Sequence, residues 1–296
     1  MKFSLWPHNS RPPVDLLAEV RTAEDTGWHG VWLADHYMPD TGDATPARGD
    51  TYECWALLPA LAAVTERIRI GTLVSPTSVH HPALLAKRAA TIDRLSGGRM
   101  VLGLGAGWQI NEHHAYCIEL EPPGKRVTRF EESIQIVRSM LSQESTTFHG
   151  GCYDVTDAPC DPKPVQSPLP LLVGTRSPRM LRITARHADE WNTWGTPERA
   201  AERRAALTET CDQVGRDPAT MRTSVNALVY LDGSAPPPGR AVLVGSAQHL
   251  VDQLGQYAEL GFDEFILPDW NLGPDRSERA DNIARIKAEV LDHLHA

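Results

Sequence analysis

Short apolar segments alternate with amphipathic ones along almost the whole chain. Apolar residues at three- and four-residue spacing predict helices over 12–27, 55–64, 82–95, 126–141, 177–187, 196–215, 246–260 and 279–294. The apolar segments that precede them predict strands over 3–6, 30–35, 68–74, 100–104, 171–174, 190–194, 221–231 and 262–267. Such alternation indicates a parallel sheet, and eight strand–helix pairs in 296 residues favour a closed (β/α)8 TIM barrel over an open doubly wound sheet.

Two stretches break this rhythm. Between about 142 and 170, repeated prolines and a short extended piece near Tyr153 indicate an insertion, and 232–240 is a Pro/Gly loop without periodicity. A length of 296 residues suits one barrel better than two compact domains. We therefore expect a single domain over 1–296 that carries one insertion.

The segment from Ser96 to Trp108 is rich in glycine. Met100 to Leu104 predicts a buried central strand, and side-chain alternation places Gly103, Gly105 and Gly107 on one face. A dinucleotide-binding loop would need a third glycine at 108, where this chain has Trp108. Two explanations of the bare backbone remain open: close packing on a neighbouring element, or close approach of a flat ligand.

Functional residues of such barrels follow the carboxyl ends of the strands. Asp35 and His36 end the second predicted strand, and the imidazole of His36 suits proton transfer. The segment 73–77 carries no charge, which suits an apolar flat ligand. Residues 174–179 open a helix beside Arg176 and Arg179, an arrangement that favours an anion. Among the tryptophans, those near strand ends are the candidates for a pocket: Trp6, Trp108 and Trp194.

Composition narrows the partners. With 29 Lys and Arg against 38 Asp and Glu, the net charge of −9 argues against nucleic acid or an anionic membrane. Five cysteines without a Cys-x-x-Cys pair indicate free thiols in a reducing cytoplasm. No signal-peptide core or run of about 18 apolar residues is present, so we expect a cytoplasmic protein. The pairs at 80–81 and 113–114 lack zinc-ligand spacing, so no metal is expected.

Three segments of the chain resemble a known family. Trp32 to His36, Leu95 to Trp108 and Ala185 to Trp191 are similar to the bacterial luciferase-like flavin and deazaflavin oxidoreductases, and the similarity runs from 3 to 267. Within that family the chain most resembles the branch that depends on coenzyme F420. The resemblance implies a (β/α)8 barrel with an insertion, an isoalloxazine or deazaflavin ring at its mouth, and a homodimer.

The resemblance also implies roles for single residues. His36 matches a histidine near the reactive edge of the ring, and Leu73 and Val74 match a non-prolyl cis peptide behind it. Residues 174–177 match a loop that binds the cofactor phosphate. Two positions depart from relatives: Trp108 stands where some carry a catalytic Glu, leaving Glu112 as the nearest carboxylate, and Asp40 stands where some carry Trp.

These arguments predict hydride transfer between the deazaflavin C5 and a small organic substrate. One alternative is an FMN-dependent monooxygenase supplied by a separate flavin reductase, and another is a flavin-binding protein without catalysis; F420 would likewise need a reductase or other electron source. The predicted catalytic residues are His36 and Glu112, and the predicted substrate pocket contains Trp6 and Trp108. The predicted cofactor-binding residues are Asp35, His36, Leu73, Val74, Gly105, Ala106, Gly107, Gly174, Thr175, Arg176, Ser177 and Trp194.

Overall fold

The computed structural model describes residues 1–231 and 240–295 and contains a closed parallel barrel. Its strands follow one another around the ring as β1 (Lys2–Trp6), β2 (Gly30–Leu33), β3 (Arg69–Thr72), β5 (Met100–Gly105), β8 (Leu171–Gly174), β9 (Glu190–Trp194), β10 (Arg222–Asn226) and β13 (Glu264–Pro268). β1 pairs with both β2 and β13, which closes the ring. The two-residue β4 (Ser75–Pro76) continues the path of β3 and pairs with β5. The predicted eight-stranded barrel is confirmed.

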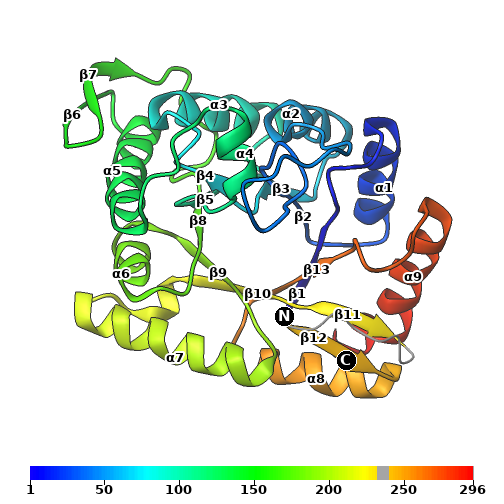
Figure 1. The fold of residues 1–296 in the computed structure, drawn as a ribbon. Coiled ribbons are helices and arrows are strands. Elements are labelled where there is room, and N and C mark those ends of the chain that lie inside the picture. The colour runs from blue at the N-terminus through cyan, green and yellow to red at the C-terminus, as the bar shows by residue number, and fades with distance from the viewer. Residues whose placement is uncertain (232–239, 296) are drawn as a thin grey trace.

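Helices surround the barrel as an outer layer (Figure 1). They are α1 (Pro13–Asp25), α2 (Cys54–Val64), α3 (Pro82–Leu95), α5 (Pro123–Ser142), α6 (Pro178–His187), α7 (Pro197–Val214), α8 (Ala247–Glu259) and α9 (Arg276–Glu289). Single 3-10 turns occur at Pro218–Thr220 and Leu291–His295. Five of the helices begin with proline, whose missing N–H costs nothing in a first turn. Within the described residues, no helix combines the length and apolarity needed to span a bilayer.

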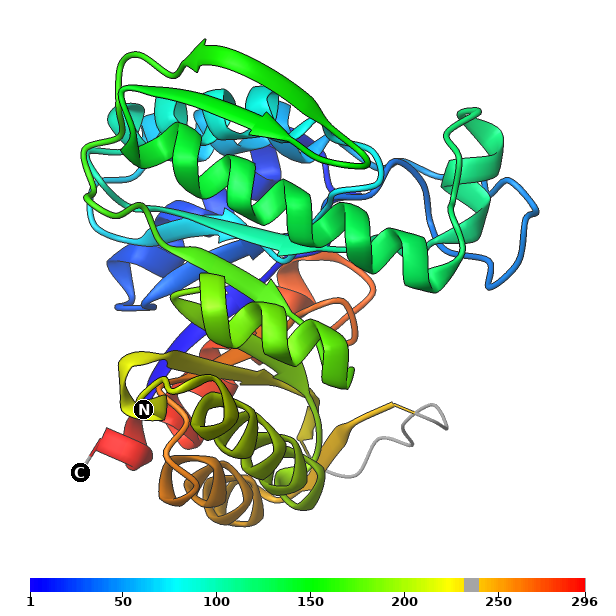
Figure 2. The same cartoon turned by 90° about the vertical axis from the view of Figure 1, so that its left-hand side faces the viewer.

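The two ends of the barrel differ. In the side view of Figure 2 both termini lie at one end, where the strands begin. The short helix α4 (Ile110–Ala115) and the loop after β2 project from the opposite end. The carboxyl ends of the strands therefore open toward α4, and we refer to this end as the mouth.

Two predicted segments differ from the structure. The predicted strand 221–231 is two strands, because the chain leaves the barrel after Asn226 and β11 (Leu228–Leu231) pairs with β12 (Val242–Gly245) outside it. Both halves are largely buried, so hydrophobicity alone did not indicate the break. The insertion contains an antiparallel hairpin of β6 (Ser145–His149) and β7 (Asp154–Pro159). The predicted loop 232–240 lies outside the described residues except at its last position.

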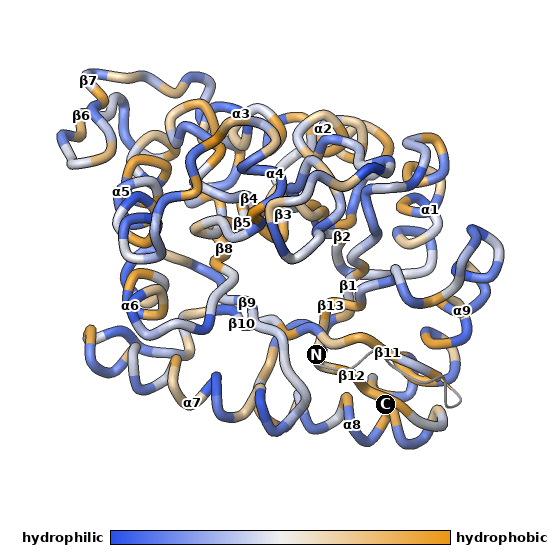
Figure 3. Tube along the Cα trace, in the orientation of Figure 1, coloured by the Kyte–Doolittle hydropathy of each residue, from blue (hydrophilic) through white to orange (hydrophobic). Residues whose placement is uncertain are grey.

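Apolar residues form two separate clusters. The larger one lies between helices and strands, where Figure 3 shows hydrophobic residues along the strands and on helix sides turned toward them. The smaller one includes side chains that alternate into the barrel: Trp6, Trp32, Leu73, Val101, Leu172 and Ile266. A filled interior is expected of an eight-stranded barrel, so a ligand can enter only above this inner cluster, at the mouth.

Ion pairs close the end opposite the mouth. Arg69 pairs with Glu190 and lies 3.4 Å from Glu264, which Arg222 also contacts at 3.1 Å. Nε2 of His29 lies 2.9 Å from Arg222 and must accept this bond, since a guanidinium only donates. Glu264 is fully buried and its two arginine partners compensate its charge.

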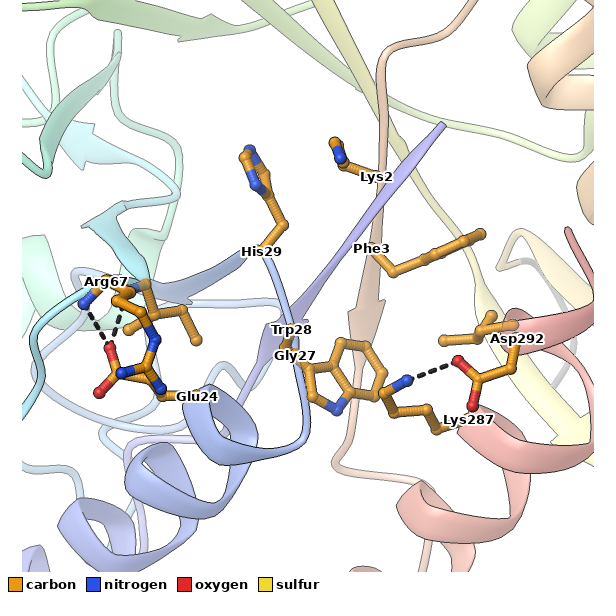
Figure 4. Close-up of a pocket in the computed structure, with 11 residues that line it drawn as sticks. Lys2, Phe3, Glu24, Gly27, Trp28, His29, Arg67, Lys287 and Asp292 are labelled. Atoms are coloured by element: carbon orange, nitrogen blue, oxygen red, sulfur yellow. Dashed lines mark hydrogen bonds and ion pairs between the residues drawn. The ribbon is translucent and has the colours of Figure 1, made fainter. Parts of the chain in front are cut away.

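A pocket of about 250 Å³ lies beside this network (Figure 4). Its carboxylates already have partners, because Glu24 accepts bonds from backbone N–H groups of 66–68 and Asp292 pairs with Lys287 at 2.5 Å. Figure 4 shows Lys2 and His29 on one side of the pocket and Trp28 below them. Because it lies at the amino ends of the strands, the pocket is remote from the mouth.

We predict that His29 makes the fold less stable as the pH falls. Burial is the main cause that lowers the pKa of His29 from 6.5 to about 4, although Glu264 opposes the shift. Between these two values the unfolded chain binds a proton that the folded protein does not, so stability declines from about pH 6.5 toward pH 4. His29→Gln keeps an acceptor for Arg222 and should lose less stability over this range, by up to about 1 kcal/mol per pH unit. Urea unfolding at pH 7, 6, 5 and 4 tests this, and parallel slopes for the two proteins would contradict it.

Candidate active site

The glycines of β5 allow the chain between β3 and β4 to pass directly over that strand. A Cβ on Gly103 would lie 2.0 Å from the carbonyl oxygen of Thr72, and one on Gly105 would lie 2.7 Å from Val74. Gly107 has φ +89°, and a Cβ there would lie 2.1 Å from Ser78 Oγ. Close packing, one of the two explanations left open, therefore accounts for all three glycines. The peptide bond Leu73–Val74 in this crossing segment is cis, as the resemblance implied.

Asp35 anchors the crossing segment, residues 72–78, and the residues that follow it through hydrogen bonds. Its Oδ2 accepts hydrogen bonds from Ser75 Oγ at 2.5 Å and Trp55 Nε1 at 2.8 Å, and His80 Nε2 lies 2.8 Å away. Burial alone would raise the pKa of Asp35, but His80 and the other donors bring it below its ordinary value. The carboxylate is 1 % exposed, and its Oδ1 has no hydrogen-bond partner among the described residues. Asp35 thus positions the segment 75–80 and can offer a ligand one oxygen at most.

His36 and Glu112 form a dyad at the mouth. Nδ1 of His36 lies 2.9 Å from Glu112 Oε1, and the other carboxylate oxygen accepts the backbone N–H of Tyr37 at 2.9 Å. Glu112 is 1 % exposed, whereas the His36 side chain is 24 % exposed. A carboxylate facing Nδ1 assigns the proton to that nitrogen, which leaves Nε2 as the acceptor of the neutral ring. Trp108 meets His36 edge to face with ring centroids 5.4 Å apart, and more than half of its surface is exposed.

The loop after β8 carries Arg176, which has no hydrogen-bond or ion-pair partner among the residues that the structure describes. Arg176 and Ser177 are exposed, and Ser177 begins α6 without a side-chain cap. Arg203 of α7 donates to the carbonyl oxygen of Trp194. Burial lowers the pKa of Arg203, and the charges of Arg176 and Arg199 lower it further, so the three guanidinium groups share one region. An anion bound there would relieve their mutual repulsion.

Arg179 differs from this group. It donates to the carbonyl oxygen of Gly124 at 3.0 Å and to Thr128 at 2.9 Å, and it pairs with Glu131 at 3.4 Å. These contacts tie α6 to α5. Protein partners therefore explain Arg179, which the sequence had suggested as part of the anion site.

Indole rings form the wall of the mouth between β1, β9 and β13. Ring centroids of Trp6 lie 5.6 Å from Trp194 and 5.1 Å from Trp270. The side-chain amide of Asn226 has one orientation in which its oxygen faces a donor and its nitrogen faces acceptors. In this orientation the oxygen accepts a hydrogen bond from Trp194 Nε1 at 2.9 Å. Trp6 is 8 % exposed, and its Nε1 has no hydrogen-bond partner among the described residues.

The structure brings several of the predicted site residues together. His36 contacts both Glu112 and Trp108, and Gly105 and Gly174 both pack against Val74. Ala106 directly precedes Gly107, and the carbonyl oxygen of Gly107 accepts a hydrogen bond from Arg126. Of the two residues predicted to line the substrate pocket, Trp6 belongs to the indole wall and Trp108 contacts His36.

Several residues of the site were missed by the sequence argument. His8 lies just beyond the end of β1, a position that the strand-end rule could have included. Three further residues at the mouth are Arg199, Arg203 and Asn226. Their helix and strand have ordinary amphipathic or buried patterns, which do not indicate a functional residue. His80 was considered only as a metal ligand, whereas it is a partner of Asp35. Among the described residues no cluster of His, Cys, Asp and Glu could hold a metal ion.

Comparison with known proteins places the chain in a family. The sequence model of the luciferase-like monooxygenases matches residues 1–235. The chain belongs to this family. An uncharacterized protein of Mycobacterium tuberculosis is 31 % identical over 306 aligned positions, which cover 98 % of this chain and 99 % of the relative.

Other proteins that are similar to this chain have named activities. The F420-dependent glucose-6-phosphate dehydrogenase of Amycolatopsis mediterranei is 33 % identical over 180 positions, 60 % of this chain and 52 % of that protein. An F420-dependent secondary alcohol dehydrogenase has a TM-score of 0.83 at 19 % identity, with 98 % of each chain covered. The monooxygenase RslO1 from Streptomyces bottropensis has a TM-score of 0.81 at 20 % identity over the full length of both. The structural likenesses show the shared fold of this luciferase-like protein.

We predict that the crossing segment tolerates no side chain at Gly103 of β5, where it packs on the backbone of the strand. Gly103→Ala forces a methyl group against the Thr72 carbonyl and should destabilise the protein by about 1–3 kcal/mol or more. Gly124→Ala is the matched control, because a Cβ there meets nothing within 4 Å and the first turn of α5 gains stability of about 0.4–1 kcal/mol. Urea unfolding measures both. Equal midpoints for Gly103→Ala and the parent protein would contradict the close packing.

Proposed function

We propose that this luciferase-like protein is an F420-dependent oxidoreductase that transfers a hydride between the deazaflavin and a small organic substrate. The observation that carries the proposal is the dyad of His36 and Glu112, held beside the crossing segment at the barrel mouth. The dyad can move a proton next to a redox ring, as an alcohol–carbonyl interconversion requires. F420-dependent relatives support the choice of cofactor.

The residues at the mouth suit a planar ring with a phosphorylated arm. Leu73 and Val74 offer an uncharged surface for the ring, and the unpartnered Oδ1 of Asp35 can accept a bond from it. Thr175, Arg176 and the uncapped start of α6 would hold the phosphate. When bound, F420 supplies a ring carbon, C5, that accepts or donates a hydride.

Within this site His36 would hold the mobile proton. Glu112 orients the imidazole and compensates the positive charge that appears when Nε2 takes a proton from substrate. The backbone N–H of Tyr37 in turn fixes the carboxylate, so neither partner needs to reorganise during the reaction. Trp108 packs edge to face with the imidazole and borders one side of it.

An FMN-dependent monooxygenase is the second candidate. The family description and the monooxygenase RslO1 favour it, and a phosphate loop would serve FMN as well as F420. A flavin-binding protein without catalysis is the third, supported by Trp108 and Asp40 at positions where some active relatives differ.

Titration of the protein with each cofactor, measured by fluorescence quenching, distinguishes F420 from FMN. We expect oxidised and reduced F420 to bind with micromolar affinity and FMN to bind at least about tenfold more weakly. Arg176→Ala should weaken F420 binding about tenfold or more by removing a charge-assisted contact with the phosphate. Arg182→Ala on the same helix is the control, because this arginine is exposed and has the same charge. Tight FMN binding without F420 binding would overturn the proposal.

Proton transfer by the dyad is tested with His36→Gln. Glutamine retains a contact with Glu112 but cannot take a proton, so turnover should fall by about 10²–10⁴-fold while the affinity for F420 stays within about threefold. Glu112→Gln should cause a smaller loss, because the imidazole remains but its orientation is no longer charge-assisted. The measurement is F420-linked turnover of the best substrate from a panel of simple alcohols and ketones. Wild-type activity in His36→Gln would contradict the assignment, and no wild-type turnover would favour the protein without catalysis.

A further inference from the structure

His8 occupies a fixed position at the mouth. It lies two residues beyond the end of β1, where the backbone N–H of Asp269 donates to the carbonyl oxygen of Trp6 at 3.2 Å. Asp269 Oδ1 in turn accepts the backbone N–H of His8 at 3.3 Å. These bonds join the carboxyl ends of β1 and β13 and leave the His8 side chain partly exposed.

The contacts of the imidazole assign its tautomer. The backbone N–H of Ser10 donates to Nδ1 of His8 at 3.2 Å, and the Ser10 hydroxyl lies 2.8 Å from the same nitrogen. A backbone amide cannot accept, so Nδ1 is the acceptor and the proton of the neutral ring lies on Nε2. Burial lowers the pKa of His8, and the charges of Arg11 and His36 lower it further, so the neutral form prevails at pH 7. Nε2–H has no partner among the described residues.

The two histidines of the mouth are therefore complementary. β1 and β2 are neighbours in the barrel, and His8 and His36 each follow the carboxyl end of one of them. The charge of His36 accordingly acts on His8. Glu112 fixes the proton of His36 on Nδ1, so its Nε2 is an acceptor, whereas Nε2 of His8 is a donor. A neutral donor and a base at the same end of the barrel suit an oxygen that gains or loses a proton during reaction.

The surroundings of His8 suit an uncharged molecule. Its ring meets Trp270 edge to face, 6.2 Å between centroids, and Trp270 packs on Trp6, whose buried Nε1 also lacks a partner. Arg11, whose charge acts on His8, is 6 % exposed and is already paired with Asp269 and Glu19. Arg203, with Arg176 and Arg199 in the same region, meets the wall at Trp194, whereas the described residues that contact His8 include no free guanidinium. The wall thus offers apolar surface and neutral N–H donors.

We propose that His8 is a substrate-positioning residue whose Nε2–H binds the oxygen of an uncharged alcohol or ketone on the indole wall, opposite the base His36. The proposal deepens the proposed function and rests on it for the chemistry. In alcohol oxidation the C–H bond breaks and its electron pair leaves as hydride to oxidised F420. The O–H proton passes to His36 Nε2 while the C=O bond forms, with the oxygen held by His8.

The test uses four compounds that share one six-membered carbon ring. Cyclohexanecarboxamide resists hydride reduction and reports binding through tryptophan fluorescence, with F420 present and absent. Cyclohexyl phosphate is the charged counterpart, and cyclohexanol and cyclohexanone report turnover. We expect the amide to bind more tightly than the phosphate ester. His8→Phe should weaken amide binding about tenfold and raise KM for cyclohexanol more than it lowers kcat.

Two further variants separate hydrogen bonding from structure. His8→Gln retains an N–H donor and should stay within about threefold of wild type in amide affinity and KM. His149→Phe is the control for the exchange itself, because His149 lies on the exposed β6 hairpin. Thermal melting checks that all variants are folded.

The outcomes distinguish this inference from the proposed function. Equal amide affinity in His8→Phe and wild type would overturn the role of His8 whatever cofactor binds. Tighter binding of cyclohexyl phosphate than of the amide would also overturn it when F420 is present and fills the phosphate loop at Arg176. If F420 fails to bind while amide affinity still depends on His8, the proposed function falls and the substrate-binding role stands.

Discussion

The crossing of the chain over β5 is the constraint on which the mouth depends. The segment 72–78 can lie against β5 only because Gly103, Gly105 and Gly107 leave its backbone bare. Asp35 then holds that segment through Ser75 and His80, and Asp35 immediately precedes His36 along the chain. The same packing therefore positions the uncharged surface of Leu73 and Val74 and also the base, His36. A displacement of this segment would move the two together.

Charge is distributed along the barrel axis in a way that leaves the mouth free for a ligand. At the closed end, Glu190 and Glu264 are buried and compensated by Arg69 and Arg222. Above them the inner apolar cluster fills the barrel. At the mouth, by contrast, Asp35 Oδ1 and Trp6 Nε1 are buried and have no hydrogen-bond partner among the described residues. Because an unpaired buried polar atom is unfavourable, each of these two atoms offers a hydrogen bond to a ligand at the mouth.

The sequence predicted what periodicity and position along a strand can reveal. The eight strand–helix pairs followed from hydrophobic spacing, and His36 was found because it directly follows a strand. The break after Asn226 was missed, since residues on both sides of it are buried and apolar burial does not reveal which sheet a strand joins. Contacts between distant elements were also beyond reach. Nothing in the local sequence indicates that Arg203 of α7 reaches the end of β9, or that Arg179 pairs with Glu131.

The departures from relatives at Trp108 and Asp40 take on a different meaning once the geometry is known. A carboxylate is missing at 108, but the first turn of α4 brings Glu112 to His36 instead, and burial keeps that carboxylate in place. Trp108 then packs edge to face with the ring that the carboxylate orients. A protein that had lost catalysis would have no need to bury an acidic residue against a partly exposed histidine, because such burial costs free energy. Retention of this costly pair argues for a working acid–base group and against a merely binding role.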